Sequence, residues 1–524
     1  METKSPVYPE LNKAWKSTCK VLLGEEIGEL KDYESWLKGF RPKLGKRESS
    51  ISGKEVTLAT DDYCESANFV SLDEAKEKTV DPLSINEIKD IDTIIEALTE
   101  KWEYTGNKVL GNSKFIEASD DIIDSHFILD SAHIQQSNNV FASFFVTTNS
   151  KYIFGSNWVV GGEFYIRSTG LGSKRTLGAV FQEDCSDLYF SYMCTGCHDV
   201  MFSINQKNKR NCIGNLELPK EKYLELKKKL IEEIKDELRT SREFPSIFDL
   251  ASKGQPNKKM DLPISTKKAE EDMKLIEKSF NSAIRIIFKK ETGQVTDYED
   301  WLSGHFPRIK ELVSPFGSKV YDADWSTFLL YPENRTVSRE EAEELSKLHI
   351  EELEAGSLDK IKESLPRIGY FTGEFLFGKC MNVIKSPMVS NSSNIYAVAD
   401  ANYSDYSAVD FTLINSKYAF GSHRISESQF CIKCYNSLNL NRCFEVDSCS
   451  NCADTLFAHN CEGLNEAMFC FNVKGKRCAI GNAALPPEQY KRIKNSLVEQ
   501  MADEIIKNKR LRYDIFNIGC AGRK

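Results

Sequence analysis

The sequence lacks several features that mark common functional classes. It has no run of about 18 apolar residues or more, so we expect no transmembrane helix. Its first residues, METKSPVYPELNKAW, contain neither the basic nor the apolar stretch of a secretory signal peptide. The net charge of -9 disfavours general binding to nucleic acids or anionic membranes. These absences predict a cytoplasmic protein without membrane contact.

Signatures of familiar catalytic sites are missing as well. The chain has no P-loop, no GxGxxG after a strand, no GxSxG and no kinase signature. Its 7 histidines include no HExxH pair. Cysteine, in contrast, is abundant at 16 residues. A reducing cytoplasm disfavours stable disulfides, so this abundance raises the question of metal or redox chemistry.

An internal repeat runs through the chain with an offset of 265–267 residues. DYESWLKGFRP (32–42) returns as DYEDWLSGHFP (297–307), and NSKYIFGS (149–156) returns as NSKYAFGS (415–422). IGNLELPKEKY (213–223) returns as IGNAALPPEQY (480–490). Because the matches keep their order and spacing, the sequence predicts a tandem duplication.

The middle of each repeat has a period of six residues. In the first repeat, serine holds one position of each hexad, and isoleucine or valine follows three residues later: Ser113, Ser119, Ser125, Ser131, Ser137 and Ser143, with Ile116, Ile122, Ile128, Ile134, Val140 and Val146. This period fits neither a helix nor a simple alternating strand. Short strands separated by regular corners produce it, with small side chains at corners and β-branched ones on flat faces. Stacked coils of this kind bury one continuous core.

The ladder resembles that of parallel β-solenoids such as the hexapeptide-repeat β-helices. In that family the small residue lies four positions after the aliphatic one, whereas here it lies three away. Handedness, coil length and the acyltransferase activity common in that family are therefore left open, and a plain antiparallel β domain is the alternative fold. The cysteine hexads followed by IGN, LPxExY and a helix are also similar to cysteine-rich repeat proteins of unassigned function from microbial genomes.

The expected fold class is α+β, a tandem duplication in which each unit has a helical cap, a parallel β-solenoid and a C-terminal amphipathic helix. Apolar residues at helical spacing predict helices over 13–39, 86–104, 219–238, 338–365 and 486–507. The expected domains are helical caps at 1–110 and 271–379, solenoids at 111–215 and 380–482, C-terminal helices at 216–250 and 483–524, and a linker at 251–270.

The stretch CIKCYNSLNLNRCFEVDSCSNCADTLFAHNC (431–461) poses the metal question most directly. Its two CxxC pairs, Cys431 with Cys434 and Cys449 with Cys452, have the spacing of a zinc ribbon, and His459 lies near them. These cysteines also fall on the three-residue grid of the ladder, which produces CxxC wherever two consecutive inward positions are cysteine. Cysteine is small and readily buried. We therefore expect structural cysteines and no cofactor, with a zinc or iron–sulfur site on these four residues as the alternative.

The repeated DYExWLxG motif supplies another pair of candidate sites. Tyr33 and Trp36 in the first copy match Tyr298 and Trp301 in the second. One interpretation is that these rings pack the helical part against the solenoid end, which needs a cover. The other is that they anchor a binding partner, a role for which Trp and Tyr are favoured.

The leading functional hypothesis is a non-enzymatic scaffold or macromolecule-binding protein that presents long flat faces to a protein or large assembly. One alternative is a metal-binding protein using the second repeat's cysteines. Another is a β-helix-type enzyme acting on a sugar or acyl group in a groove between the units. A ribonucleoprotein target reached through the basic run KNKRLR (507–512) stays open. Two units in one chain imitate a homodimer, so we expect either a monomer with an internal pseudo-two-fold axis or a homo-oligomer.

Overall fold

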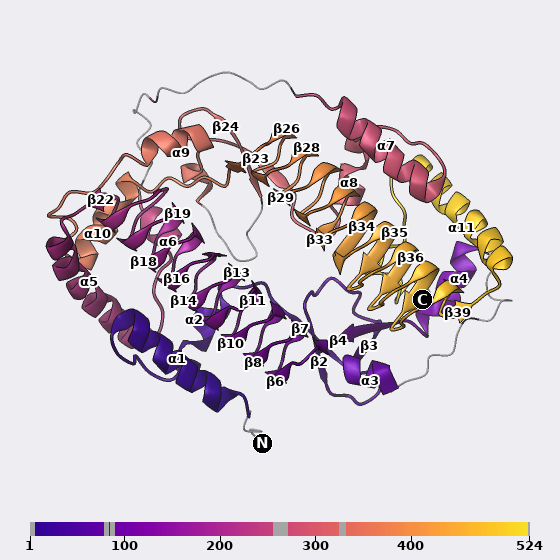
Figure 1. Ribbon diagram of the computed structural model, residues 1–524, viewed down its shortest axis with the longest axis horizontal. Coiled ribbons are helices and arrows are strands. Elements are labelled where there is room, and N and C mark those ends of the chain that lie inside the picture. The colour runs from indigo at the N-terminus through magenta and orange to yellow at the C-terminus, as the bar shows by residue number, and fades with distance from the viewer. Residues whose placement is uncertain are drawn as a thin grey trace.

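The computed structural model describes residues 6–77, 83, 90–254, 262, 271–323 and 332–521. It combines helices with long parallel sheets, which confirms an α+β protein with β-solenoid-like structure (Figure 1). We call residues 109–217 the first solenoid and residues 375–484 the second solenoid. None of the helices in these described ranges has an apolar stretch long enough to cross a membrane.

Most coils of the first solenoid take twelve residues, as the spacing between paired strands shows; single coils take thirteen or eleven, as between Asn138 and Lys151 and between Glu163 and Lys174. Ile128, for example, lies beside Ile116 and Val140. The outer sheet consists of β6 (Lys114–Glu117), β8 (His126–Leu129), β10 (Asn138–Phe141), β12 (Lys151–Phe154), β14 (Glu163–Ile166), β16 (Lys174–Leu177), β18 (Ser186–Tyr189), β20 (His198–Met201), β21 (Arg210–Ile213) and β22 (Leu216–Glu217). The inner sheet consists of β5 (Val109–Leu110), β7 (Asp120–Ile123), β9 (Ala132–Gln135), β11 (Phe144–Thr147), β13 (Asn157–Val160), β15 (Gly170–Leu171), β17 (Val180–Glu183) and β19 (Tyr192–Thr195).

The second solenoid has the same coil length, and its strands join into one sheet of 15 strands. Its inner face consists of β25 (Phe375–Phe377), β27 (Met388–Ser390), β29 (Asp400–Asn402), β31 (Thr412–Ile414) and β33 (His423–Ser426). The rest consists of β26 (Met381–Ile384), β28 (Ser393–Tyr396), β30 (Asp405–Ala408), β32 (Lys417–Phe420), β34 (Gln429–Leu438), β35 (Asn441–Asp447), β36 (Ala453–His459), β37 (Asn465–Phe471), β38 (Arg477–Ile480) and β39 (Ala483–Ala484).

The three-residue grid of the sequence has a backbone origin. Along a coil, every third residue adopts a left-handed conformation, as Phe127 (φ 56°), Asp130 (φ 53°) and His133 (φ 54°) do. The residue after each of these points inward, so Ile128 and Ser131 follow Phe127 and Asp130. A left-handed L-residue costs about 1–2 kcal/mol, which the hydrogen bonds between stacked coils offset.

Serine occupies the small inward position because its hydroxyl joins successive coils. The Ser131 hydroxyl donates to the carbonyl of Leu129 at 2.9 Å and accepts the N–H of Ser143 at 3.0 Å. The same two contacts recur at Ser125 and Ser143. A buried N–H without a partner is costly, so the position requires a small side chain that can both donate and accept.

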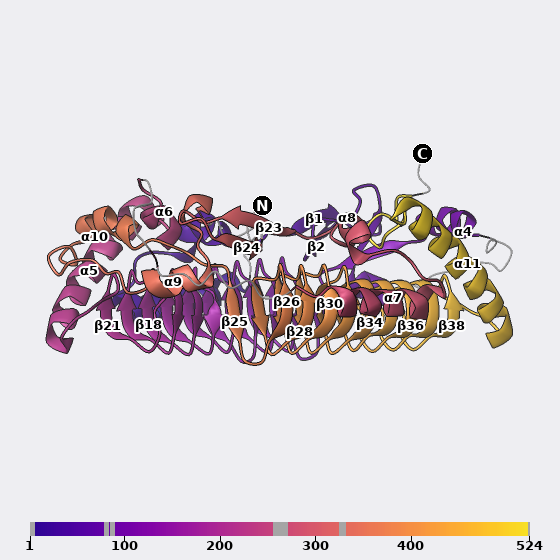
Figure 2. The same ribbon diagram turned by 90° about the horizontal axis from the view of Figure 1, so that it is seen from above.

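Helices cover the outer faces and the far ends of the solenoids. Helix α1 (Tyr8–Leu23) lies along the outer sheet of the first solenoid, and α7 (Lys274–Phe288) lies along that of the second (Figure 1). Helices α5 (Lys220–Ser241) and α11 (Pro487–Asn508) stand at opposite ends of the molecule (Figure 2). Short helices follow α1 and α7: η1 (Leu30–Tyr33), α2 (Glu34–Lys38), η3 (Val295–Tyr298) and α8 (Glu299–Leu302). Helix α6 (Ile247–Ala251) follows α5.

The segment before each solenoid packs against the other solenoid, an arrangement that we call the reciprocal exchange. Residues 45–106 share one hydrophobic core with α11 and the last coils of the second solenoid. They form β1 (Gly45–Glu48), β2 (Glu55–Leu58), β3 (Asn68–Ser71), α3 (Leu72–Glu77), α4 (Ile91–Thr99) and β4 (Glu103–Gly106). Residues 309–371 pack on the end of the first solenoid and form β23 (Ile309–Val313), β24 (Lys319–Ala323), η4 (Glu333–Arg335), α9 (Arg339–Leu345), α10 (Leu358–Ser364) and η5 (Leu365–Arg367).

Two backbone hydrogen bonds mark the exchange. The N–H of Ile350 donates to the carbonyl of Gly214 at 3.0 Å, and the N–H of Leu83 donates to that of Gly481 at 3.1 Å. We expected residues 1–110 to cover their own solenoid, but the latter half of that range covers the other one. The crossing segments bury apolar residues at the ends of the two solenoids.

Several local expectations differ from the structure. The helix expected over 86–104 ends at Thr99, and β4 begins at Glu103; residues 86–89 lie outside the described ranges. The helix expected over 338–365 is broken into α9 and α10. Of the linker 251–270, only residues 251–254 and 262 are described.

Free thiols were expected throughout the chain, but Cys64 and Cys520 form a disulfide across 456 residues of sequence. The exchange brings the two together, because Cys64 belongs to the crossing segment and Cys520 to the C-terminal tail beside it.

Candidate functional site

The cysteine stretch 431–461 lies inside the second solenoid. Its six cysteine side chains are almost fully buried, and their thiols contact backbone groups as the serine hydroxyls of the first solenoid do. Cys449 Sγ lies 3.1 Å from the carbonyl oxygen of Asp447 and accepts the N–H of Cys461 at 3.2 Å. These contacts support the interpretation of the cysteines as structural.

The metal alternative depends on four cysteines of the second solenoid. Cys431, Cys434, Cys449 and Cys452 point into the solenoid core, and the described residues contain no group of three or more side chains suited to hold a metal ion. Burial raises the thiol pKa of Cys434 and Cys449 well above its usual value, whereas the hydrogen bond with Cys449 lowers the pKa of Cys452. His459 is already engaged: its Nδ1 lies 3.0 Å from Asp447 Oδ2, and its Nε2 accepts the N–H of Thr105 at 2.9 Å.

The four aromatic residues of the two DYExWLxG motifs are buried and are not exposed at the surface. Tyr33 and Tyr298 are fully buried, and Trp36 and Trp301 are 7% and 8% exposed. Tyr33 donates to the carbonyl of Ile27 at 2.9 Å, and Trp36 Nε1 donates to that of Phe244 at 3.0 Å. This placement fits their role in packing the helices against the solenoids, and it leaves little surface for a partner.

The basic run 507–512 carries internal ion pairs. Lys509 Nζ lies 3.4 Å from Asp297, and Arg512 lies 2.8 Å from Asp92. Arg512 also lies 3.4 Å from Glu504. These carboxylates neutralise much of the charge that a nucleic acid would need.

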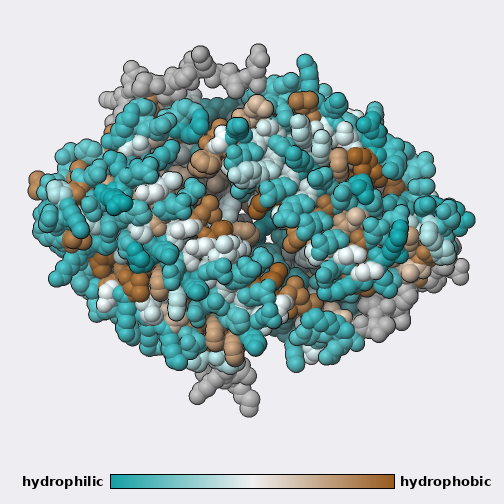
Figure 3. All heavy atoms as spheres, viewed as in Figure 1, coloured by the Kyte–Doolittle hydropathy of each residue, from teal (hydrophilic) through white to brown (hydrophobic). Residues whose placement is uncertain are grey.

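The inner faces of the two solenoids meet around a cavity of 510 Å³, which we call the central pocket. The surface is hollowed at this point, with hydrophobic residues at its rim (Figure 3). Both solenoids and the crossing segment line the pocket, with Thr60, Asp61, Asp62, His133, Phe144, Phe145, Asn157, Trp158, His305, Phe306, Phe411, His423, Arg424, Tyr435 and Asn436 among its residues. Its volume falls within the range of small-molecule sites.

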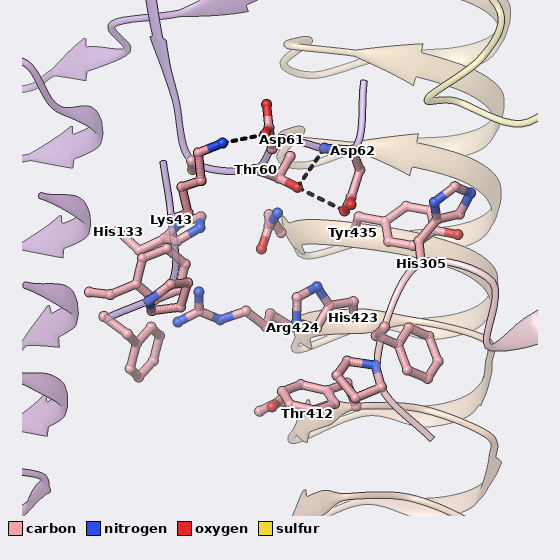
Figure 4. A pocket seen from close by; sticks show the side chains of 18 of the residues that line it. Lys43, Thr60, Asp61, Asp62, His133, His305, Thr412, His423, Arg424 and Tyr435 are labelled. Carbon is pink, nitrogen blue, oxygen red and sulfur yellow. Dashed lines mark hydrogen bonds and ion pairs between the residues drawn. The ribbon is translucent and has the colours of Figure 1, made fainter. Parts of the chain in front are cut away.

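Arg424 on β33 extends across the pocket toward the first solenoid (Figure 4). Its guanidinium carbon lies 4.2 Å from the ring centroid of Phe145 and 4.9 Å from that of Phe144. The Nη1 atom is buried without a hydrogen-bond partner, and no ion pair of Arg424 is found within the described residues. Burial lowers the guanidinium pKa to about 9, against the opposing charge of Asp121, so Arg424 stays protonated at neutral pH.

Imidazoles surround this cation. His133 Nδ1 lies 2.5 Å from Asp121 Oδ2. Burial alone would raise the pKa of Asp121, but the hydrogen bond and charge of His133 hold it at about 2. Burial and the charge of Arg424 lower the pKa of His133, and they lower that of His423 further. Arg424 is therefore the dominant positive charge among these three at neutral pH.

Three more polar atoms in the pocket lining are buried without partners among the described residues: Asn157 Nδ2, the Tyr435 hydroxyl oxygen and Asn436 Oδ1. The opposite wall is acidic and already bonded. Thr60 donates to Asp62 at 2.7 Å, and Asp61 lies 3.5 Å from Lys43. Buried polar groups are normally satisfied, so these atoms are available to a ligand that enters the pocket.

Sequence reasoning missed the central pocket, although the sequence holds a signal for it. The repeated NSKYIFGS and NSKYAFGS are followed by Asn157 and Trp158 in one copy and by His423 and Arg424 in the other. A change of chemistry directly after nearly identical residues marks a position worth examining.

Fold and site together define a β-solenoid-like α+β protein with a ligand-sized pocket between its two solenoids. Comparison with protein-family models, with curated proteins and with solved structures finds no match.

Proposed function

We propose that the chain arose by tandem duplication and folds as a monomer with an internal pseudo-two-fold axis. Contacts recur at equivalent places in the two halves, which supports this proposal. Asn205 donates to the carbonyl of Tyr370 at 3.0 Å, and Asn472, 267 residues later, donates to that of Glu103 at 3.4 Å. The central pocket contains equivalent residues from both halves, such as Phe144 and Phe411, whose N–H groups donate to the carbonyls of the equivalent Ser156 and Ser422.

We infer that the protein is a non-enzymatic binding protein whose central pocket holds a small anionic ligand, with a carboxylate or phosphate group on Arg424. A scaffold that presents long flat faces finds less support, because helices cover the outer faces and the inner faces meet each other. A cytoplasmic location and the absence of a resident cofactor remain part of the proposal.

The unpartnered guanidinium of Arg424 carries the inference. Two other solenoid guanidinium groups are paired, Arg175 with Asp187 at 2.6 Å and Arg442 with Asp454 at 2.6 Å. Arg167 lies against Trp36 and Phe40 with its Nε unpartnered among the described residues, but it does not line the central pocket. Arg424 instead lies half-buried against two phenyl rings with an unused donor atom. Arginine in such a setting suits the planar oxygens of a carboxylate or phosphate.

The test is calorimetric titration of the full chain with benzoate, phenyl phosphate and inorganic phosphate. We expect saturable binding of at least one anion, weakened about 10–100-fold in Arg424→Gln because one charged hydrogen bond is lost. Arg175→Gln is the matched control and should bind normally. Equal affinities of wild type and Arg424→Gln, or no binding of any of the three anions, would contradict the proposal.

The pair of His133 and Asp121 favours a second candidate, an enzyme that acts on an acyl or sugar group. A neutral imidazole oriented by a carboxylate is the usual form of a general base. Release of 4-nitrophenol from its acetate or glycosides by wild type, lost in His133→Gln, would favour this candidate. No release above that of buffer would leave the binding function alone.

A further inference from the structure

A second cavity of 730 Å³ lies between the same inner faces and shares Phe145 and Trp158 with the central pocket. We call it the apolar groove. Its walls come from β11, β13, β15, β17 and β19 of the first solenoid and from β25, β27, β29 and β31 of the second. No function discussed above uses it.

Six aromatic side chains line the apolar groove: Phe145, Trp158, Phe181, Phe375, Phe377 and Tyr403. Its charged lining residues are both acidic, Glu183 on β17 and Asp400 on β29. No Lys, Arg or His is among the described residues that line it. The groove therefore combines negative charge with ring faces, and its charge is opposite in sign to that of Arg424 in the central pocket.

Neither carboxylate has a hydrogen bond or ion pair from its side chain within the described part of the chain. Several other carboxylates on the solenoid strands are paired, as Asp405 is with Lys417 at 3.0 Å. Burial raises the pKa of Asp400 to about 7 and also raises that of Glu183. An acid held in an apolar cavity without a counter-ion is stabilised by any cation that enters.

We propose that the apolar groove binds an organic cation, an amine or quaternary ammonium group on an apolar body, with Asp400 and Glu183 as counter-ions. The cationic head satisfies the carboxylates and contacts the negative faces of neighbouring rings. The apolar body displaces water from the remaining aromatic and methionine surface. This site is separate from the anion site at Arg424 and does not depend on it.

The test compares two probes of the same shape on the wild-type chain at pH 8. We expect 2-phenylethylamine to bind at least about tenfold more tightly than the neutral 2-phenylethanol, measured by calorimetry. The double variant Asp400→Asn with Glu183→Gln should remove this preference and leave the weak binding of the alcohol unchanged. Asp405→Asn, which alters a paired carboxylate on an outer strand, should keep the preference.

Three outcomes would overturn the proposal: equal binding of amine and alcohol to wild type, a preference that survives in the double variant, or no saturable amine binding. Arg424→Gln separates the two sites, since it should weaken benzoate binding and leave amine binding intact. An amine site can thus fail while the anion site stands, and the reverse also holds.

Discussion

If the Cys449 thiol links successive coils through backbone hydrogen bonds, serine can replace cysteine at this position and alanine cannot. The Cys449 thiol lies 3.1 Å from the carbonyl oxygen of Asp447 and accepts the N–H of Cys461 at 3.2 Å. In Cys449→Ser, the hydroxyl makes both contacts, as Ser143 does in the first solenoid. We expect this variant to lose less than about 1 kcal/mol of stability.

Cys449→Ala removes both contacts. The orphaned N–H of Cys461 costs about 1–3 kcal/mol, and the void left by the sulfur costs about 1 kcal/mol more. Alanine should therefore be worse than serine by about 2 kcal/mol or more, measured by equilibrium urea unfolding. Ser143→Cys and Ser143→Ala form the matched pair in the first solenoid and should show the same order.

A metal site would give a different result. If Cys449 were a ligand, serine and alanine would both lose the metal and would be similarly destabilised. Elemental analysis of the purified wild type belongs to the same experiment. Stoichiometric zinc or iron, lost in both variants, would refute the ladder explanation of this stretch.

Three further predictions concern pH, the exchange and the disulfide. Asp400→Asn should stabilise the unliganded protein by about 2–3 kcal/mol at pH 8 and little at pH 4, by thermal melting. The raised pKa of Asp400, about 7, means that its contribution to the stability of wild type is full below about pH 4 and is lost as pH rises from there through 7. Gly214→Ala and Gly481→Ala should each cost about 1–3 kcal/mol of stability. Both residues have positive φ (57° and 56°), and an added Cβ would lie 2.5 Å and 2.4 Å from side chains of the crossing segments. Unchanged melting temperatures of these variants would argue against the exchange. Cys520→Ser should cost about 2–4 kcal/mol by removing the disulfide to Cys64, and no shift on reduction of wild type would show that the bond does not form.

The sequence predicts the repeating structure within each solenoid, but it does not predict how the two solenoids and the crossing segments pack together. The recurrence of Ser113 to Ser143 identifies the inward positions because one small residue per hexad is a strict steric and hydrogen-bonding requirement. The sequence does not determine the number of residues per coil, because a period of six residues describes one face of the solenoid and does not say how many faces make up a coil. The short strand β4 was mistaken for helix because Trp102 and Tyr104 continue the apolar spacing of α4, and only pairing with β3 makes them extended.

Candidate sites within one solenoid can likewise be predicted from the sequence, whereas those between the two solenoids cannot. The structural role of the cysteines follows from their place on the grid. The central pocket could not be located from local patterns, because Arg424 meets Phe145 only after two distant solenoids have come together. Nothing in residues 45–106 indicates which solenoid they cover, since an apolar surface fits either end until both are formed.

The reciprocal exchange also gives the two halves different histories during synthesis. The first solenoid is complete at residue 217, but the segment that covers its end, 309–371, emerges later from the ribosome. The second solenoid finds its cover, residues 45–106, already made. The two halves are packed similarly in the folded protein, but they are covered at different stages of translation. The first solenoid keeps an uncovered end while most of another hundred residues are translated, and the second can be covered as soon as it is translated.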